Sequence, residues 1–196
     1  VTAPEDRDRL AALIAAADIV ITDASPVDTE QWQLLTLGGG SAVRVSITPF
    51  GLSGPYRDYP ATASTLLAIG GYTFLSGDIG REPLTFPGRY PYYQAGTYAY
   101  TAAVAAHLRG RDESAPTTIE VSVLETITSL HQFTDTLWSQ DRIIRSRHGN
   151  RWENLCPTTM VACADGWVAM NIIPTFWAQF ALMLGRPELA DHPDYA

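Results

Sequence analysis

The stretch from Ile47 to Tyr56 contains the residues best suited to hold a ligand, in the order Ile-Thr-Pro-Phe-Gly-Leu-Ser-Gly-Pro-Tyr. It reads as the end of a strand that runs into a loop interrupted by glycine and proline. Open α/β sheets bind their ligands where strands end in such loops. The sequence therefore predicts a binding edge in this loop.

A second group of reactive or binding side chains precedes an alanine-rich helix. Arg89, Tyr90, Tyr92 and Tyr93 follow one another closely there. The arginine could pair with a carboxylate or a phosphate, and the tyrosines could form the wall of a pocket. Aromatic packing beside one surface arginine is the alternative, and the sequence leaves both interpretations open.

The elements that must position these residues follow an α-β-α-β order in the first fifty residues, which is typical of a doubly wound sheet. We expect strands at 18–22, 42–47 and 117–123, and helices at 4–17, 28–37, 61–71, 94–109, 124–140 and 174–184. A loop is expected at 72–87. An Asp-Gly turn predicts a hairpin over 159–171.

The basic, polar connector 142–151 suggests a domain boundary. We therefore expect part of a large α/β domain at 1–141 and the start of a smaller α+β domain at 142–196. The run Gly38–Gly40 does not indicate a dinucleotide site, because it follows an expected helix instead of a strand. It reads as a helix end and a turn.

Composition excludes several classes of function. The 196 residues carry 21 acidic residues against 13 arginines and no lysine, so the net charge is −8. An acidic chain without a basic stripe is a poor nucleic-acid binder. No apolar run is long enough to span a membrane, and the N-terminus lacks the features of a signal peptide. Cys156 and Cys163 lack metal-ligand spacing and fit small buried residues of a reduced, cytoplasmic protein without a metal.

Seven segments, in order, resemble the class III CoA-transferases of the CaiB/BaiF family. They are Ala17–Thr22, Val45–Tyr56, Gly96–Leu108, Ile119–Val123, Gly149–Arg151, Ala164–Val168 and Leu184–Leu189. The resemblance implies a partial Rossmann-like large domain followed by a smaller α+β domain. It also implies that the chain is a middle fragment of a longer protein, and that the protein forms a dimer.

The resemblance implies CoA or an acyl-CoA as substrate, together with a carboxylic acid, and no metal. In the family, an aspartate attacks the thioester and forms a mixed anhydride. Its position is taken here by Tyr92, and no Asp or Glu occurs from Pro83 to Arg111. No catalytic residue is therefore expected in this segment. The family also implies CoA contacts near Ser25, Thr48, Phe50, Gly51, Arg89 and Tyr93, although basic residues common at the first two positions are missing.

Two hypotheses follow from the resemblance. In the first, the chain is part of a transferase that moves CoA between an acyl-CoA and a carboxylic acid. In the second, it is a non-catalytic half with the transferase fold, and it pairs with a copy that keeps the aspartate. The combined loss at Ser25, Thr48 and Tyr92 motivates the second hypothesis.

Overall fold

The described residues form two compact units. The computed structural model describes residues 4–109, 117–152, 155 and 157–193. Unit 1 takes the described residues up to Thr73 and then Thr85–Ile144, whereas unit 2 takes Phe74–Leu84 and the described residues from Arg145 onward. The sequence did not indicate that Phe74–Leu84 packs with the later part of the chain. The domain limits predicted at 141 and 142 stay a prediction.

Unit 1 is built on a sheet of three parallel strands in the order β1-β2-β3. The strands are β1 (Ile19–Thr22), β2 (Val43–Thr48) and β3 (Thr118–Ser122). Short runs of β-branched apolar residues form them, as expected for strands covered on both faces. The three strands predicted from the sequence are confirmed.

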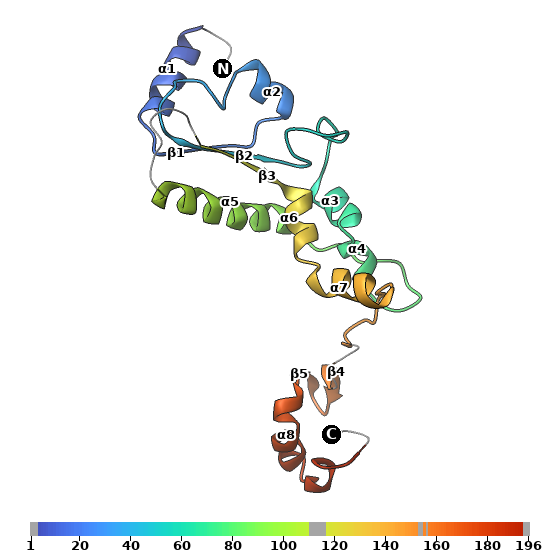
Figure 1. Cartoon of the computed structure of the whole chain (residues 1–196). Helices are drawn as coiled ribbons and strands as arrows, with labels where there is room; N and C mark the ends of the chain where they lie inside the picture. Colours follow the sequence, from blue (N-terminus) through green and yellow to red (C-terminus); the bar gives the residue numbers. More distant parts are fainter. Residues whose placement is uncertain (1–3, 110–116, 153–154, 156, 194–196) are drawn as a thin grey trace. The chain divides into compact units, whose positions relative to one another are not determined.

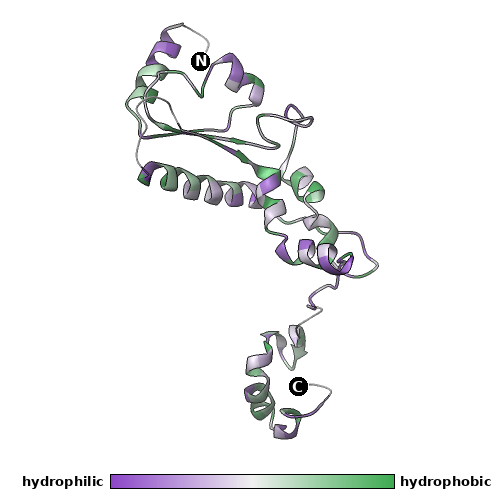
Figure 2. Ribbon diagram, in the orientation of Figure 1, coloured by the Kyte–Doolittle hydropathy of each residue, from purple (hydrophilic) through white to green (hydrophobic). Residues whose placement is uncertain are grey.

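Helices cover both faces of this sheet. In Figure 1, α5 (Tyr90–Leu108) lies on one side, and α1 (Pro4–Ala15) and α2 (Pro26–Gln31) lie on the other. Along α1 the residues change from hydrophilic to hydrophobic (Figure 2), so its later turns supply the apolar contacts. The remaining described helices wholly in unit 1 are α3 (Ala63–Ile69), α6 (Val123–Ser129) and α7 (Gln132–Asp141), whereas α4 (Tyr72–Leu75) includes the limit between the units at Thr73.

The core of unit 1 lies between the sheet and α5. Ala95, Ala99 and Ala103 recur every four residues, so they share one face of the helix, and each is at most 2 % exposed. They pack against Val45 of β2 and Val121 of β3. Because alanine is small, the backbone of α5 can approach the sheet closely. This packing holds the first turn of α5 at the carboxyl ends of the strands.

Several helix limits differ from those predicted. The helix expected at 94–109 begins at Tyr90, because Pro91 is accommodated in its first turn, where no N–H is needed. The helix expected at 28–37 exists as α2 with other limits, Pro26–Gln31, and its expected end was wrong because Gln33 has a φ of +52°, which is not helical. The helix expected at 124–140 is two helices that meet at Leu130 and His131. The loop expected at 72–87 contains α4.

The described residues of unit 2 contain the predicted hairpin, the helix α8 and two 3-10 turns. Strands β4 (Thr158–Cys163) and β5 (Gly166–Asn171) pair antiparallel across a turn at Ala164 and Asp165, which confirms the hairpin. Helix α8 covers Trp177–Met183, between the 3-10 turns η1 (Pro174–Phe176) and η2 (Pro187–Leu189). Cys163 is exposed, so its predicted burial was wrong, because the hairpin end carries it outward. Cys156 lies outside the described residues.

Arg147 ties the separate segment of unit 2 to the rest of that unit. Its guanidinium donates to the carbonyl oxygens of Phe74 at 2.7 Å and of Arg81 at 3.2 Å. It also lies over the Phe74 ring, 5.5 Å from the centroid. These contacts explain why Phe74–Leu84 belongs to unit 2.

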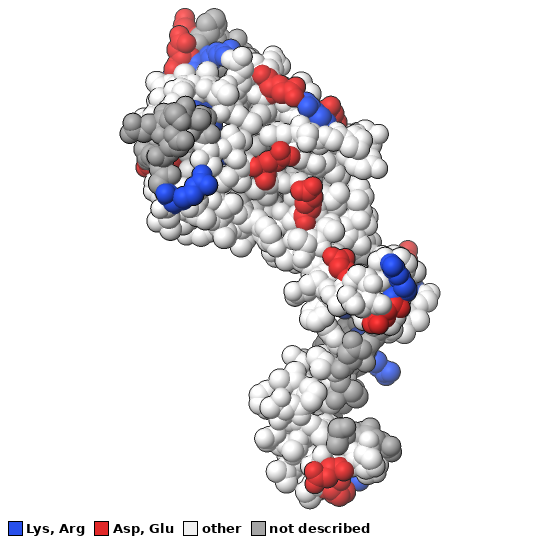
Figure 3. All heavy atoms as spheres, viewed as in Figure 1, with Lys and Arg blue, Asp and Glu red and all other residues white. Residues whose placement is uncertain are grey.

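Charged side chains are scattered over the surface. On the face drawn in Figure 3, the blue arginines stand apart from one another and form no stripe. Within the described ranges, no helix is both long and apolar enough to cross a membrane. The same ranges hold no cluster of three or more His, Cys, Asp or Glu side chains that could bind a metal ion.

Candidate functional site

The carboxyl ends of the three strands form the candidate binding edge, as expected for an open parallel sheet. Each strand ends in a residue with a hydroxyl group: Thr22, Thr48 and Ser122. Each hydroxyl oxygen accepts a backbone N–H from the segment that follows. The donors and N···O distances are Ala24 at 3.1 Å, Gly51 at 2.9 Å and Glu125 at 3.3 Å. The hydroxyl groups at the strand ends therefore fix the first residues of the segments that leave the sheet.

Ser25 lies in the loop after β1 and caps α2. Its Oγ accepts the backbone N–H of Asp28 at 3.1 Å and donates to Asp28 Oδ2 at 2.6 Å. Such a cap satisfies one of the free N–H groups at a helix start. The structure thus places this predicted CoA contact at the binding edge, with its hydroxyl already engaged.

Thr48, Phe50 and Gly51 begin the loop after β2. Thr48 is only 1 % exposed, so its hydroxyl acts inside the protein and fixes the loop. Phe50 is half-buried against the core, and its ring lies 6.1 Å from that of Tyr56. Gly51 has a φ of +97°, in the region that favours glycine. These positions are brought together as predicted, but their contact with CoA stays a prediction.

Glu120 of β3 closes the same loop. Its Oε1 accepts the backbone N–H of Leu52 at 2.7 Å. A Cβ on Gly51 would lie 2.6 Å from that oxygen. A side chain at residue 51 would therefore require the Glu120 carboxylate to shift from this position.

Replacing Gly51 by alanine should open this loop more than replacing Gly54. Both glycines have a positive φ, which costs an L-residue about 1–2 kcal/mol. Only at Gly51 would the new methyl group displace Glu120 and free the Leu52 N–H, at a further cost of about 1 kcal/mol. Hydrogen exchange of the Leu52 amide, read by NMR, measures the difference. Equal exchange rates in Gly51→Ala and Gly54→Ala would show that the Glu120 contact does not hold the loop.

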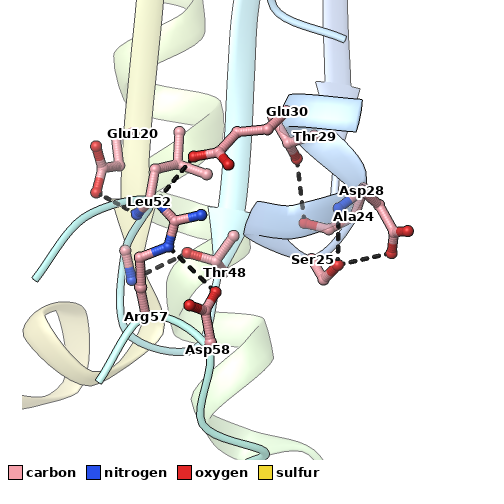
Figure 4. A network of polar contacts seen from close by, with 11 residues as sticks. Ala24, Ser25, Asp28, Thr29, Glu30, Thr48, Leu52, Arg57, Asp58 and Glu120 are labelled. Atoms are coloured by element: carbon pink, nitrogen blue, oxygen red, sulfur yellow. Dashed lines mark hydrogen bonds and ion pairs between the residues drawn. The ribbon is translucent and has the colours of Figure 1, made fainter. Parts of the chain in front are cut away.

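Arg57 completes the polar network of the edge, drawn in Figure 4. Its Nη1 lies 2.8 Å from Glu30 Oε1, and its Nε lies 3.1 Å from Asp58 Oδ1. The hydrogen bond from Arg57 lowers the pKa of Glu30, and the two acids raise the pKa of Arg57. A pocket of about 320 Å³ beside the network includes Glu30 and Leu52 in its wall.

Arg89, Tyr92 and Tyr93 lie at the start of α5. That helix runs against the strand direction, so its first turn lies at the same end of unit 1 as the binding edge (Figure 1). Arg89 precedes the helix and is exposed, and Tyr93 is 73 % exposed. Tyr92, which the resemblance predicts to replace the family's aspartate, is 37 % exposed. The first turn of α5 contains no acidic residue.

An aromatic cluster supports the start of α5. The ring of Tyr72 lies 4.2 Å from that of His131 and 5.9 Å from that of Tyr90. Phe86 stacks on Tyr90 at 5.6 Å. Burial, together with the neighbouring Tyr90, raises the pKa of Tyr72 to about 12, so the phenol stays neutral. Tyr90 therefore belongs to packing, whereas Tyr92 and Tyr93 remain open to a ligand.

Glu30, Arg57, Asp58 and Glu120 are site residues that sequence reasoning did not select. Glu30 stands in no segment that resembles the family, Glu120 stands in one whose resemblance implies only a strand, and the partners of both are far away in the sequence. Arg57 directly follows the motif loop, and this position in the sequence could have indicated that it belongs to the site.

Comparison with known proteins identifies the family. The model of CoA-transferase family III matches residues 1–196. The beta subunit of succinyl-CoA–L-malate CoA-transferase from Chloroflexus aurantiacus is 30 % identical over 98 % of this chain and 49 % of its own length. Subunit BbsE of succinyl-CoA:(R)-benzylsuccinate CoA-transferase from Thauera aromatica is 25 % identical over 85 % of this chain and 41 % of its own length.

Solved structures share the fold. A CaiB/BaiF family protein from Brucella suis has a TM-score of 0.77 at 21 % identity and covers 98 % of this chain. Rv3272 from Mycobacterium tuberculosis has a TM-score of 0.78 at 19 % identity and covers 99 %. These matches confirm the predicted α/β class. The chain spans about half the length of the relatives that it matches. On the family match over its whole length, the chain belongs to CoA-transferase family III.

Proposed function

We propose that the complete protein moves CoA from an acyl-CoA to a carboxylic acid, and that this chain supplies part of the CoA-facing edge without the nucleophile. The observation that carries the proposal is the binding edge itself. Three parallel strands end in hydroxyl residues that accept a backbone N–H from the segment after each strand, within a chain that matches the family from end to end.

In this proposal the predicted site residues divide into two groups. Ser25, Thr48, Phe50 and Gly51 shape the loops on which CoA would lie. Arg89 and Tyr93 would meet the acyl end, because both are exposed at the start of α5. Arg89 offers a guanidinium to a carboxylate of the acid substrate.

The chemical step requires a carboxylate from another part of the assembly. A carboxylate oxygen attacks the thioester carbonyl, the C–S bond breaks, and CoA leaves as its thiolate while a mixed anhydride forms. Tyr92 cannot take this role, because attack by its phenol oxygen would give an aryl ester and not a mixed anhydride. No Asp or Glu lies between Pro83 and Arg111 to replace it.

The second candidate function is that of a non-catalytic half that pairs with an active copy. Two relatives carry the word subunit in their names, which favours a paired assembly. The tyrosine at position 92 favours this version too. In both versions we propose a cytoplasmic protein that assembles as a homodimer or with a second transferase half, with an acyl-CoA and a carboxylic acid as its small-molecule partners and without a nucleic-acid or membrane partner.

The experiment that tests the proposal uses the complete gene product, alone and with any co-purifying partner. Succinyl-CoA is offered together with a panel of dicarboxylic acids, and new CoA esters are detected by mass spectrometry. Hydroxylamine then traps the anhydride, and the modified peptide is located. We expect modification at a carboxylate outside 83–111. Absence of any CoA transfer by every assembly would refute the proposed function.

The tyrosine at position 92 separates the two versions. In a protein with one transferase copy, Tyr92→Asp should raise transfer. In a protein paired with an active copy, the partner's carboxylate already performs the step, so the same variant should leave the rate close to that of the wild type. Calorimetric titration of CoA into the wild type and into Tyr92→Asp checks that the CoA affinity is the same, so that a change in rate does not come from a change in binding.

A further inference from the structure

Carboxylates of the chain itself occupy the hydrogen-bond donors of the binding edge (Figure 4). The guanidinium of Arg57 is engaged by Glu30 at 2.8 Å and by Asp58 at 3.1 Å. The Leu52 N–H donates to Glu120. These donors are of the kind that bind phosphate oxygens in other proteins, so the chain's own acids stand where an anion would bind.

The three side chains of the Arg57 ion pairs differ in how far they are exposed to solvent. The Arg57 side chain is 25 % exposed, whereas the side chains of Glu30 and Asp58 are 65 % and 55 % exposed. The arginine is therefore only partly exposed, and both acids that pair with it are more exposed than it is. Glu30 also stands in the wall of the pocket of about 320 Å³, so there is space beside the ion pair for a small group.

We propose that Glu30 and Asp58 disfavour the binding of phosphate groups at this edge, because they occupy the guanidinium of Arg57. This inference rests on the proposed function, because it concerns the phosphate-bearing end of CoA. Two carboxylates on one guanidinium leave a net negative charge, which repels a phosphate dianion. The pantetheine end, which carries no charge, is not affected. The edge thus accepts the neutral part of CoA and rejects its phosphates.

The test compares ligand affinities of the wild-type protein and the Glu30→Gln/Asp58→Asn variant by calorimetry. The probes are CoA, inorganic pyrophosphate and pantetheine. Removing both acids should strengthen binding of CoA and of pyrophosphate by at least about tenfold at low salt, and should leave pantetheine binding unchanged. Adding Arg57→Gln to the double variant should abolish the gain, because the freed guanidinium provides it.

A matched variant separates the ion pair from the general field of the acidic surface. Asp23→Asn removes an exposed carboxylate that follows β1 at the same edge and has no bond to Arg57. We expect a gain of about threefold or less for this variant, since screening weakens exposed charges. An equal gain in Asp23→Asn and the double variant would overturn the proposal. So would an unchanged affinity of the double variant, once circular dichroism shows that it is folded.

This test and that of the proposed function can fail separately. Pyrophosphate binding by the double variant does not require a nucleophile, an acyl group or a partner chain. CoA transfer by the complete protein could be demonstrated while the double variant gains nothing, and then only the role of Glu30 and Asp58 would fall. A gain in phosphate affinity without any CoA transfer would keep this inference and remove the proposed function.

Discussion

Replacing Arg44 by methionine should destabilise unit 1 by about 2–4 kcal/mol. Arg44 is the second residue of β2 and is 1 % exposed. Its guanidinium donates to the carbonyl oxygens of Leu34 at 3.1 Å and of Gly39 at 2.6 Å. Burial lowers the pKa of Arg44, so this cation is held in the interior at a cost.

The free-energy cost of Arg44→Met comes from the two hydrogen bonds that the guanidinium makes. Methionine fills a similar volume but donates no hydrogen bond, so both bonds from the guanidinium to the carbonyl groups would be lost. A hydrogen bond to a charged group is worth about 1.5–3 kcal/mol, and the relief from burying a cation offsets part of the sum. The turn that joins α2 to β2 would then lose its attachment to the sheet.

Hydrogen exchange of the β2 amides measures the effect on unit 1 alone. We expect these amides to exchange about 30-fold to several hundred-fold faster in Arg44→Met. The matched control is Arg57→Gln, which removes a partly exposed arginine from the same unit and should leave exchange in β2 within error of the wild type. If Arg44→Met exchanges as slowly as the wild type, the cost of burying the cation equals the worth of its bonds.

The parallel sheet could be predicted because its strands are short runs of apolar, β-branched residues between helical segments. The limits of the helices were harder to predict, because tertiary contacts decide them. Gln33 looks helical by composition, yet its φ of +52° ends α2, and its side chain is held by Arg7 at 2.9 Å. The break at His131 follows the packing of its ring on Tyr72, which no local pattern reveals.

The binding edge was predicted at the level of its loops but not of its charges. Thr48 and Gly51 stand in a recognisable motif, and their contact is local, over three residues. Glu30 and Arg57 are 27 positions apart, and only the folded sheet brings them to 2.8 Å. Arg44 offered a signal, since an arginine inside an apolar strand must find buried acceptors.

One acceptor of Arg44, the carbonyl oxygen of Gly39, lies in the Gly38–Gly40 turn, where we expect the second large effect. All three glycines have a positive φ, which confirms that this run is a turn. Gly38, at +78°, also packs tightly on α1: a Cβ there would lie 2.5 Å from the carbonyl oxygen of Ala11. Unlike a flexible side chain, a helix backbone cannot move aside locally. Gly38→Ala therefore forces α1 away from the turn.

Gly38→Ala should destabilise unit 1 by about 2–5 kcal/mol, the sum of backbone strain and overpacking. Gly39→Ala is the matched control, because Gly39 has a φ of +60° but nothing within 4 Å of its Cβ position. It should cost only the strain, about 1–2 kcal/mol. Hydrogen exchange of the amides of α1 and β2 separates the two variants. Equal acceleration of exchange in both variants would mean that backbone strain is the whole cost and that the Ala11 carbonyl moves to admit the methyl group. Faster exchange in Gly38→Ala than in Gly39→Ala would show that α1 packs on the turn only when residue 38 has no side chain.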